Sequence, residues 1–330
     1  MVSEVYDLEV LSNLFTYTGY CRTSKTWHQF VIHYSRNDID LLYNHLFRDK
    51  MIMTGYNNES FDYPILHHLI NHYNEYKDLD GEEVARKLYS KAQSIIEEAY
   101  TVVANKNKFI PQIDLYKIHH FDGMAKTSSL KDLEFNMRMI KLEEMPIDHS
   151  QYVFEKDIDL VLNYNKNDVE ATCQLLDYTL GNTEHPSYKG QDKIELRRSL
   201  KKKFNLDCLN FNDVKIGEQL ILQQYCKLTG KDTWSVKKMK TYRSTIELKN
   251  CIPHWINLKT SEFKKVLNII ENTIVDATPG VKQDKQFSYN LIYNGVSIDF
   301  GLGGCHACNK SGIYKIKDGR IIIDLDVSLR

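Results

Sequence analysis

The stretch Gly55-Tyr56-Asn57-Asn58-Glu59-Ser60-Phe61-Asp62-Tyr63 determines how the first half of this chain is interpreted. It follows an apolar run at residues 51–53, which predicts a short buried strand. It precedes Pro64 and apolar residues at helical spacing, which predict a helix with proline in its first turn. The stretch is therefore a predicted strand-to-helix junction, from which the carboxylate of Asp62 can point into a cleft.

Two further acids lie in the first predicted strand, around residues 5–10. Asp7 and Glu9 fall on one face of this strand, because successive side chains point to opposite faces. Burying two acids side by side is costly unless a cation lies between them. Taken alone, the same pattern also fits an edge strand whose polar face lies in water.

A fourth acid belongs to a long amphipathic helix predicted from Glu155 to about residue 180. Tyr164 and Asp168 are one helical turn apart and therefore share a face of this helix. With Asp7, Glu9 and Asp62, the chain thus offers four acids and a tyrosine that an α/β fold could bring to one cleft.

The other elements predicted before residue 180 alternate between strands and helices, which indicates an α/β class. They are strands at 15–20, 27–34 and 111–115, and helices at 37–47, 82–100 and from Ser128 onward. The highly charged segment 75–108 is interpreted as a helical insertion. The break at 181–186, which contains glycine and proline, predicts a domain boundary, so that the domains are 1–180 and 181–330.

Residues 181–330 are predicted to form a smaller α+β segment. Helical patterns occupy 191–204, 212–228 and 261–272, and strand patterns occupy 288–293, 296–300, 312–316 and 320–325. Asn294-Gly295 and Asp318-Gly319 separate pairs of these strands, and such dipeptides favour hairpin turns.

Charge is divided unevenly along the chain of 330 residues. Residues 1–180 hold 18 Lys and Arg against 28 Asp and Glu, and residues 181–330 hold 25 against 16. This division favours a metal-dependent active site next to a surface that binds a polyanion, although surface charge without a partner explains it too. The predicted DNA-binding residues of the basic half lie on one helix: Arg197, Arg198, Lys201, Lys202 and Lys203. A solvated helix face is the alternative for them.

The composition predicts a protein that does not span a membrane and that lies in a reducing compartment. The chain has no run of about 18 apolar residues and no basic-then-apolar signal pattern at its N-terminus, so we expect a cytoplasmic protein. Seven scattered cysteines indicate free thiols. Cys251 with His254, and Cys305 with Cys308, have the residue types and spacing of zinc ligands, but free thiols are the favoured interpretation.

Three motifs occur in an order that resembles the proofreading 3′→5′ exonucleases with four acidic ligands and a tyrosine. They are Asp7-Leu8-Glu9, the run from Asn57 to Phe61-Asp62, and the run from Tyr164 to Asp168. The resemblance implies a ribonuclease-H-like mixed sheet flanked by helices over residues 1–180. Asn163 stands where the related histidine variant has its base, so the resemblance is to the tyrosine variant.

The same resemblance assigns roles to the residues. It implies two Mg²⁺ or Mn²⁺ ions held by Asp7, Glu9, Asp62 and Asp168, which together suit a hard, oxygen-preferring cation. It implies that Tyr164 orients the attacking water. It also implies that Asn57 and Phe61 contact the single-stranded 3′ end of DNA or of a primer.

The end of the sequence resembles the approach to the first palm motif of bacteriophage family B-type DNA polymerases. Gly303-Gly304-Cys305-His306 precedes Asp326-Val327-Ser328, but the usual Tyr-Pro continuation is missing. Asp326 would be a metal ligand of a truncated polymerase motif. We therefore expect no polymerase activity from this chain alone, and a second chain carrying the rest of the polymerase.

The function expected from the sequence is proofreading 3′→5′ exonuclease activity in phage DNA replication, in the cytoplasm of an infected bacterial host. Two alternatives remain open. One is a stand-alone exoribonuclease with the same metal site, and the other is a non-catalytic DNA-binding subunit of a split polymerase.

Overall fold

The computed structural model describes residues 2–47, 51–98, 102–123, 127–182, 190–239, 241–278, 280–282 and 286–308. Two compact units divide the chain, Met1–Thr233 and Trp234–Arg330. Asp326 and the strands predicted at 312–316 and 320–325 lie outside the described residues.

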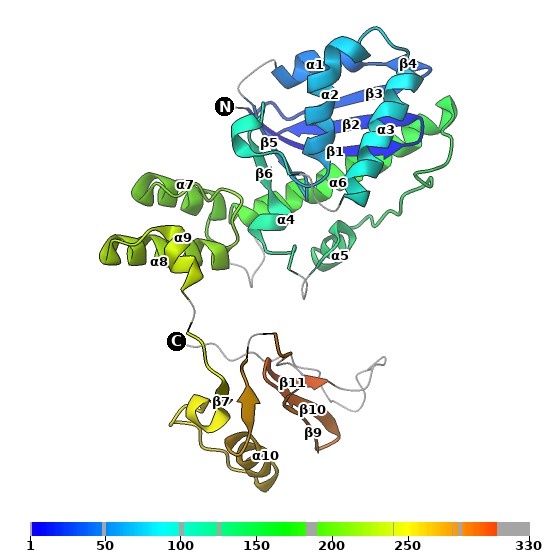
Figure 1. Ribbon diagram of the computed structural model, residues 1–330. Coiled ribbons are helices and arrows are strands. Elements are labelled where there is room, and N and C mark those ends of the chain that lie inside the picture. Colours follow the sequence, from blue (N-terminus) through cyan, green and yellow to red (C-terminus); the bar gives the residue numbers. More distant parts are fainter. Residues whose placement is uncertain are drawn as a thin grey trace. The chain divides into compact units, whose positions relative to one another are not determined.

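A mixed sheet of six strands, in the order β4-β3-β2-β1-β5-β6, forms the centre of the first unit (Figure 1). Its strands are β1 (Val2–Leu11), β2 (Leu14–Cys21), β3 (Thr26–His33), β4 (Arg36–Asn37), β5 (Met51–Gly55) and β6 (Gln112–Asp114). Strands β1 to β4 form an antiparallel meander, whereas β5 and β6 run parallel to β1. The predicted mixed sheet is thus confirmed as an α/β architecture.

Helices cover both faces of this sheet. They are α1 (Ile39–Phe47), α2 (Asp62–Tyr76), α3 (Gly81–Glu97), α4 (Leu115–Ile118), α5 (Leu130–Asn136) and α6 (Ile158–Thr179), with short 3₁₀ turns η1 (Asn105–Asn107) and η2 (Glu155–Asp157). Apolar residues of α1, α2 and α3 share a core with Tyr6, Leu8 and Val10 of β1. Those of α6 pack instead with Val5 and Leu11. Alternate residues of β1 therefore face different helical layers.

The segment predicted as a helical insertion contains α3, which is part of the layer over the sheet. Its buried apolar residues are Val84, Ala85, Leu88, Ala92 and Ile95, and all five belong to the core shared with β1. The Asp80 side chain caps the helix by accepting a hydrogen bond from the Glu83 N–H.

The units divide at Thr233, later in the chain than the break predicted at 181–186. The intervening helices are α7 (Lys193–Phe204) and α8 (Asp213–Thr229), followed by α9 (Thr233–Lys238). Ile194 of α7 packs in the same core as Val169 and Leu176 of α6. Asn210, in the loop between α7 and α8, accepts from the Asp114 N–H and donates to the Gln112 carbonyl. These contacts join residues 190–233 to the first unit.

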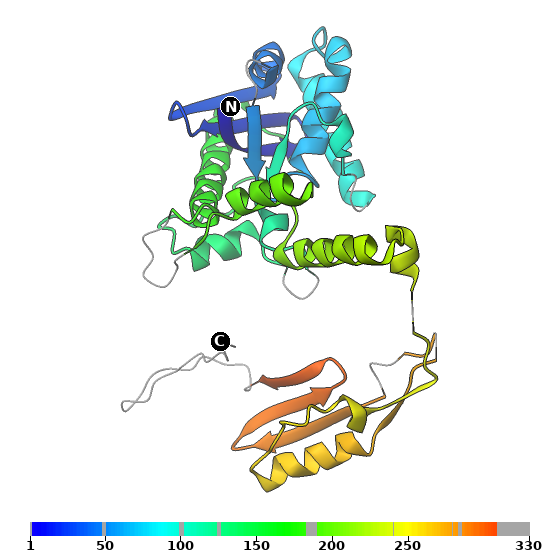
Figure 2. The same ribbon diagram turned by 90° about the vertical axis from the view of Figure 1, so that its left-hand side faces the viewer.

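The second unit begins within α9 and contains two small sheets and a further helix (Figure 2). Its elements are β7 (Thr245–Glu247), η3 (Leu248–Cys251), α10 (Ser261–Glu271), β8 (Ile274–Asp276), β9 (Ser288–Tyr293), β10 (Val296–Gly301) and β11 (Gly304–Cys308). The β9–β10 hairpin turns at Asn294 and Gly295, which have φ angles of 50° and 82°. This hairpin and α10 confirm the pattern read from the sequence for 261–300.

Candidate functional site

Three of the predicted acids converge between β1 and α6. Carboxylate oxygens of Asp7, Glu9 and Asp168 all lie within 4.8 Å of one another. Asp7 and Glu9 reach this position because they occupy the face of β1 that is covered by α6. Asp168 reaches the same position from the face of α6 that packs against β1.

The fourth acid, Asp62, approaches from the other helical layer. It is the first residue of α2, it is buried, and the Leu8 backbone N–H lies close enough to its carboxylate to favour the charged form. Strand β5 pairs with β1 only as far as Val5, so that the second half of β1 is open on this side to the start of α2. The structure therefore brings Asp62 into electrostatic contact with Asp7 and Glu9.

Burial raises the pKa of all four acids, and the charges of neighbouring site acids raise those of Asp7 and Glu9 further. Burial, followed by the charge of Asp62, raises the pKa of Asp7 well above its usual range. Burial and the charge of Asp168 do the same for the pKa of Glu9. Burial raises the pKa of Asp62 to about 7 and also raises that of Asp168. Such mutual repulsion is relieved by divalent cations, and a set of carboxylate oxygens suits Mg²⁺ or Mn²⁺.

Tyr164 lies one turn before Asp168 on α6 and its hydroxyl is hydrogen-bonded to that carboxylate. Burial, the negative charges of Asp168 and Glu9, and that hydrogen bond raise the pKa of Tyr164 far above its ordinary value. The hydroxyl therefore stays protonated at neutral pH and can orient a neighbouring group without acting as a base. A cleft of about 600 Å³ adjoins Tyr164 and is lined by Lys141 and Lys166, among others.

One lysine and one asparagine at this site were not identified as site residues from the sequence. Lys131 of α5 donates to Asp168 Oδ1 at 2.9 Å, pairs with Glu134 at 3.3 Å, and lies 4.6 Å above the centre of the Tyr164 ring. Asn165 of α6 donates from Nδ2 to Asp7 Oδ2 at 2.6 Å. The only sequence signal for Lys131 is its place in the helix predicted from Ser128 onward, and Asn165 lies inside the third motif without a role of its own.

The loop that carries Asn57 and Phe61 is organised by Asp114 at the end of β6. Asp114 Oδ1 accepts from the Asn57 N–H at 3.1 Å, and its Oδ2 accepts from the Glu59 N–H at 3.2 Å. Asn57 has a φ of 59°, which asparagine tolerates better than most residues. Asn57 and Phe61 are both half-buried, and Phe61 packs against the core under α2.

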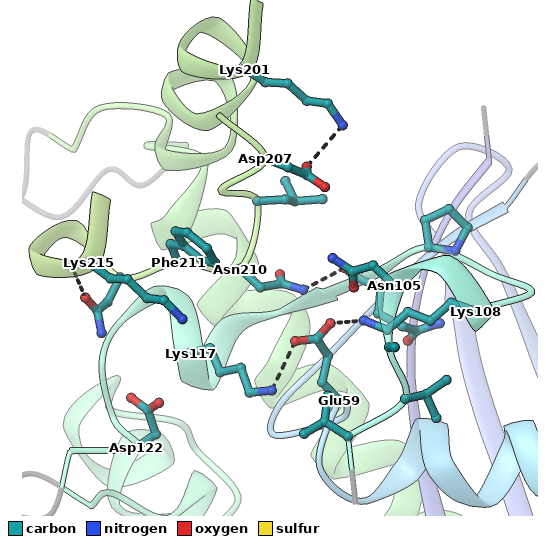
Figure 3. A pocket seen from close by; sticks show the side chains of 17 residues that line it. Glu59, Asn105, Lys108, Lys117, Asp122, Lys201, Asp207, Asn210, Phe211 and Lys215 are labelled. Carbon is teal, nitrogen blue, oxygen red and sulfur yellow. Dashed lines mark hydrogen bonds and ion pairs between the residues drawn. The ribbon is translucent and has the colours of Figure 1, made fainter. Parts of the chain in front are cut away.

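Glu59, the remaining acid of this loop, is held by two lysines. Its carboxylate pairs with Lys108 and, at 3.1 Å, with Lys117, in a pocket of about 490 Å³ (Figure 3). Burial opposes its ionisation, but the hydrogen bond from Lys108 and the charge of Lys117 hold the pKa of Glu59 below its usual value. Glu59 is thus held ionised by two lysines, and its pKa is shifted in the opposite direction to those of the four acids described above.

The predicted DNA-binding cluster on α7 requires one correction. Arg197 is buried, with only 1% of its surface exposed, and its guanidinium donates to the carbonyls of Phe211 and Lys193 and to Asp213. It therefore joins α7 to the start of α8 and is not available to phosphates. Arg198, Lys201, Lys202 and Lys203 are exposed on the same helix.

The possible zinc ligands Cys251, His254 and Cys305 do not form a metal-binding cluster among the described side chains. Cys251 and Cys305 are exposed free thiols. Neither of them, nor His254, belongs to a group of three or more potential metal ligands among the described side chains. The side chain of Cys308 lies outside those described.

The chain matches no protein-family model, no curated protein and no solved structure. Among the described residues, no helix is both long and apolar enough to cross a membrane.

Proposed function

We propose that this protein is a 3′→5′ exonuclease that hydrolyses the terminal phosphodiester bond of a DNA strand. The observation that carries the proposal is the meeting of Asp7, Glu9 and Asp168 within 4.8 Å, from a strand and a helix that lie far apart in the sequence. The mixed sheet flanked by helices is compatible with the ribonuclease-H-like fold that the motif resemblance implies.

The proposed site would hold two divalent cations through Asp7, Glu9, Asp62 and Asp168. Bound there, such ions would lower the pKa of a water molecule and neutralise charge on the phosphate. The protein orients one of these carboxylates directly, because the Asn165 side chain donates a hydrogen bond to Asp7. Tyr164, protonated at neutral pH, would orient the attacking water through its hydroxyl.

Two features support a nucleic-acid substrate. The cleft beside Tyr164 has a polar lining that includes Lys141 and Lys166 as well as acidic residues. The α7 helix presents Arg198, Lys201, Lys202 and Lys203, which can contact phosphates. The resemblance of residues 303–328 to a palm motif is the reason we assign the activity to proofreading in a bacteriophage-type DNA polymerase.

The experiment that tests the proposal compares two double variants of the full chain. Asp7→Asn with Glu9→Gln removes two acids of the site, and Glu155→Gln with Asp159→Asn removes two exposed acids of η2 and α6. Each protein is incubated with 5′-labelled single-stranded DNA, or RNA of the same sequence, with Mg²⁺ or with excess chelator.

We expect Mg²⁺-dependent shortening from the 3′ end by the unaltered protein and by the exposed-acid variant, and none by the site variant. The site variant should remain folded and be at least as stable in chelator, because repulsion between acids is relieved. Hydrolysis that persists in chelator, or in the site variant, contradicts the proposal. Faster hydrolysis of RNA would reassign the substrate.

A further inference from the structure

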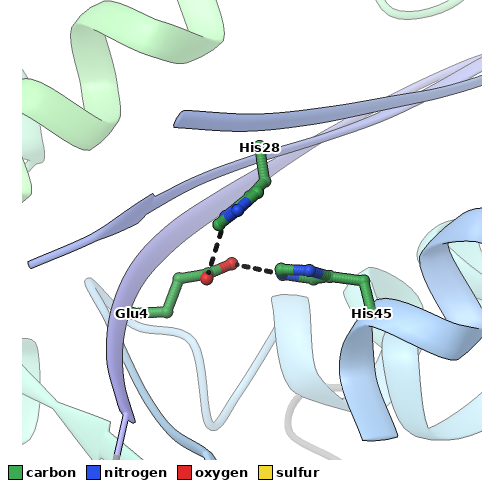
Figure 4. A group of neighbouring side chains, drawn as sticks. All are labelled: Glu4, His28 and His45. Atoms are coloured by element: carbon green, nitrogen blue, oxygen red, sulfur yellow. Dashed lines mark hydrogen bonds and ion pairs between the residues drawn. The ribbon is translucent and has the colours of Figure 1, made fainter. Parts of the chain in front are cut away.

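A second cluster of potential metal ligands lies on the other face of β1. It consists of Glu4, His28 of β3 and His45 of α1, whose ligand atoms all lie within 4.8 Å of one another (Figure 4). Glu4 is an even-numbered residue of β1, like Tyr6 and Leu8, and so faces α1 to α3. Asp7 and Glu9 face α6, so the sheet separates the two clusters.

The carboxylate of Glu4 is fully buried and lies between the two imidazoles. His45 Nε2 is 2.8 Å from Glu4 Oε1, and His28 Nδ1 is 3.2 Å from Glu4 Oε2. Burial opposes ionisation of Glu4, yet its pKa is lowered because His45, Tyr17 and His28 stabilise the charged form. The site thus brings two imidazole nitrogen atoms to a buried carboxylate, one at each of its oxygens.

The surroundings hold these three side chains in place. Tyr17 donates its hydroxyl to Glu4 Oε1 at 2.6 Å, and Thr26 Oγ1 lies 3.5 Å from the second nitrogen of His28. Gly19 pairs directly with His28 across the sheet, and a Cβ atom at Gly19 would lie 2.3 Å from Glu4 Oε1. Glycine is therefore required at that position for the carboxylate to fit. Such outer contacts are typical of metal sites, where they fix ligand orientation.

The donor set distinguishes this cluster from the four acids. Two imidazole nitrogens and one carboxylate suit zinc and neighbouring divalent transition metals, whereas Mg²⁺ prefers oxygen ligands alone. A hydrogen-bonded network in which one histidine is protonated is the competing interpretation, and it predicts no metal affinity. The ligands come from β1, β3 and α1, three elements that a bound ion would hold together.

We propose that Glu4, His28 and His45 form a binding site for one divalent transition-metal ion, separate from the candidate nuclease centre. The ion would be bound by His45 through Nε2, by His28 through Nδ1 and by the Glu4 carboxylate. Its role would be structural, because it would tie α1 to strands β1 and β3 of the sheet. This inference does not depend on the proposed nuclease function.

The test uses the full chain with Asp7→Asn, Glu9→Gln and Asp168→Asn, so that the carboxylate centre no longer binds cations. Co²⁺ is the spectroscopic probe, and Zn²⁺ is used for thermal stability. To this background we add His28→Asn, which changes the half-buried ligand and is the mildest of the three ligand substitutions. His120→Asn, which changes an exposed histidine, is the matched control.

We expect one equivalent of Co²⁺ with visible bands of a four- or five-coordinate ion and without thiolate charge-transfer bands. His28→Asn should weaken binding at least about tenfold, and His120→Asn should leave it unchanged. Zn²⁺ should raise the thermal midpoint of the background protein. Thiolate bands, equal affinity in both histidine variants, or a background protein that neither binds Co²⁺ nor is stabilised by Zn²⁺ would each overturn the proposal.

Discussion

Asn165 donates a hydrogen bond from its side-chain nitrogen to Asp7 Oδ2 at 2.6 Å, and so joins helix α6 to the first strand at the candidate nuclease site. Thr16 Oγ1 donates to the other end of the same amide, Asn165 Oδ1, at 3.4 Å. The hydrogen bond from Thr16 of β2 therefore orients the Asn165 amide so that its nitrogen points to Asp7. The amide fixes which oxygen of Asp7 remains open to a cation.

Replacing this amide should weaken cation binding. Asn165→Leu removes the donor, so Asp7 gains rotational freedom, and we expect the concentration of Mg²⁺ or Mn²⁺ for half-maximal binding to rise about tenfold or more. Calorimetric titration with Mn²⁺ measures this change. Asn71→Leu on the exposed face of α2 is the control, and equal affinities in both variants would remove Asn165 from the site.

Tyr164→Phe should reduce nuclease turnover without abolishing it. The substitution removes only a hydroxyl that positions water, so a loss of about 10²-fold or less is expected at saturating cation and substrate. The pH profile should keep its shape, because the tyrosine stays protonated throughout the neutral range. Tyr225→Phe, at a partly exposed tyrosine of α8, controls for the change of residue type. Unchanged turnover in Tyr164→Phe would exclude the role.

Lys131→Met should strengthen cation binding. The ammonium group occupies Asp168 Oδ1 at 2.9 Å, so a cation that uses the same oxygen must compete with it. Removing the ammonium frees that oxygen and leaves more negative charge at the site, and half-saturation should occur at a severalfold lower Mn²⁺ concentration. Lys166→Met, which removes a lysine stacked on Trp27, should change little. Weaker binding in Lys131→Met would show that the lysine supports the cations.

Stability of the cation-free protein should fall as pH rises from about 4 to 7. Burial raises the pKa of Asp62 from 3.8 to about 7, so the folded protein binds more protons than the unfolded chain in this window. The free energy of unfolding then decreases with rising pH. Urea denaturation in chelator should show this slope, and Asp62→Asn should flatten it. If the slope is unchanged in Asp62→Asn, the pH dependence of stability arises from other groups.

Binding of single-stranded DNA should depend on the exposed part of α7. Replacing Arg198, Lys201, Lys202 and Lys203 by alanine should make the plot of log affinity against log salt shallower, by about 0.7 for each phosphate that the variant no longer neutralises. Replacing the exposed Lys264 and Lys265 of α10 by alanine is the control for loss of positive charge elsewhere on the protein. Equal slopes in all three proteins would assign these residues to a solvated helix face.

The sequence predicted the acids better than the groups that surround them. Alternation along a strand placed Asp7 and Glu9 on one face, and helical spacing placed Tyr164 beside Asp168, because both patterns are local. The neighbourhood of Lys131 and Asp168 depends on how α5 packs against α6, which no local pattern reveals. Arg197 was misassigned for the same reason. A basic helix has the same sequence whether its arginine meets solvent or the carbonyl of Phe211.

Strand β1 carries different chemistry on its two faces, and this makes its register unusually costly to change. A slip of one residue would move Asp7 and Glu9 into the apolar layer under α1 to α3, and would move Tyr6 and Leu8 into the carboxylate cluster. The same slip would withdraw Glu4 from His28 and His45. Misaligned pairing of β1 with β2 is therefore penalised on both sides of the sheet at once, which leaves a single alignment for this strand.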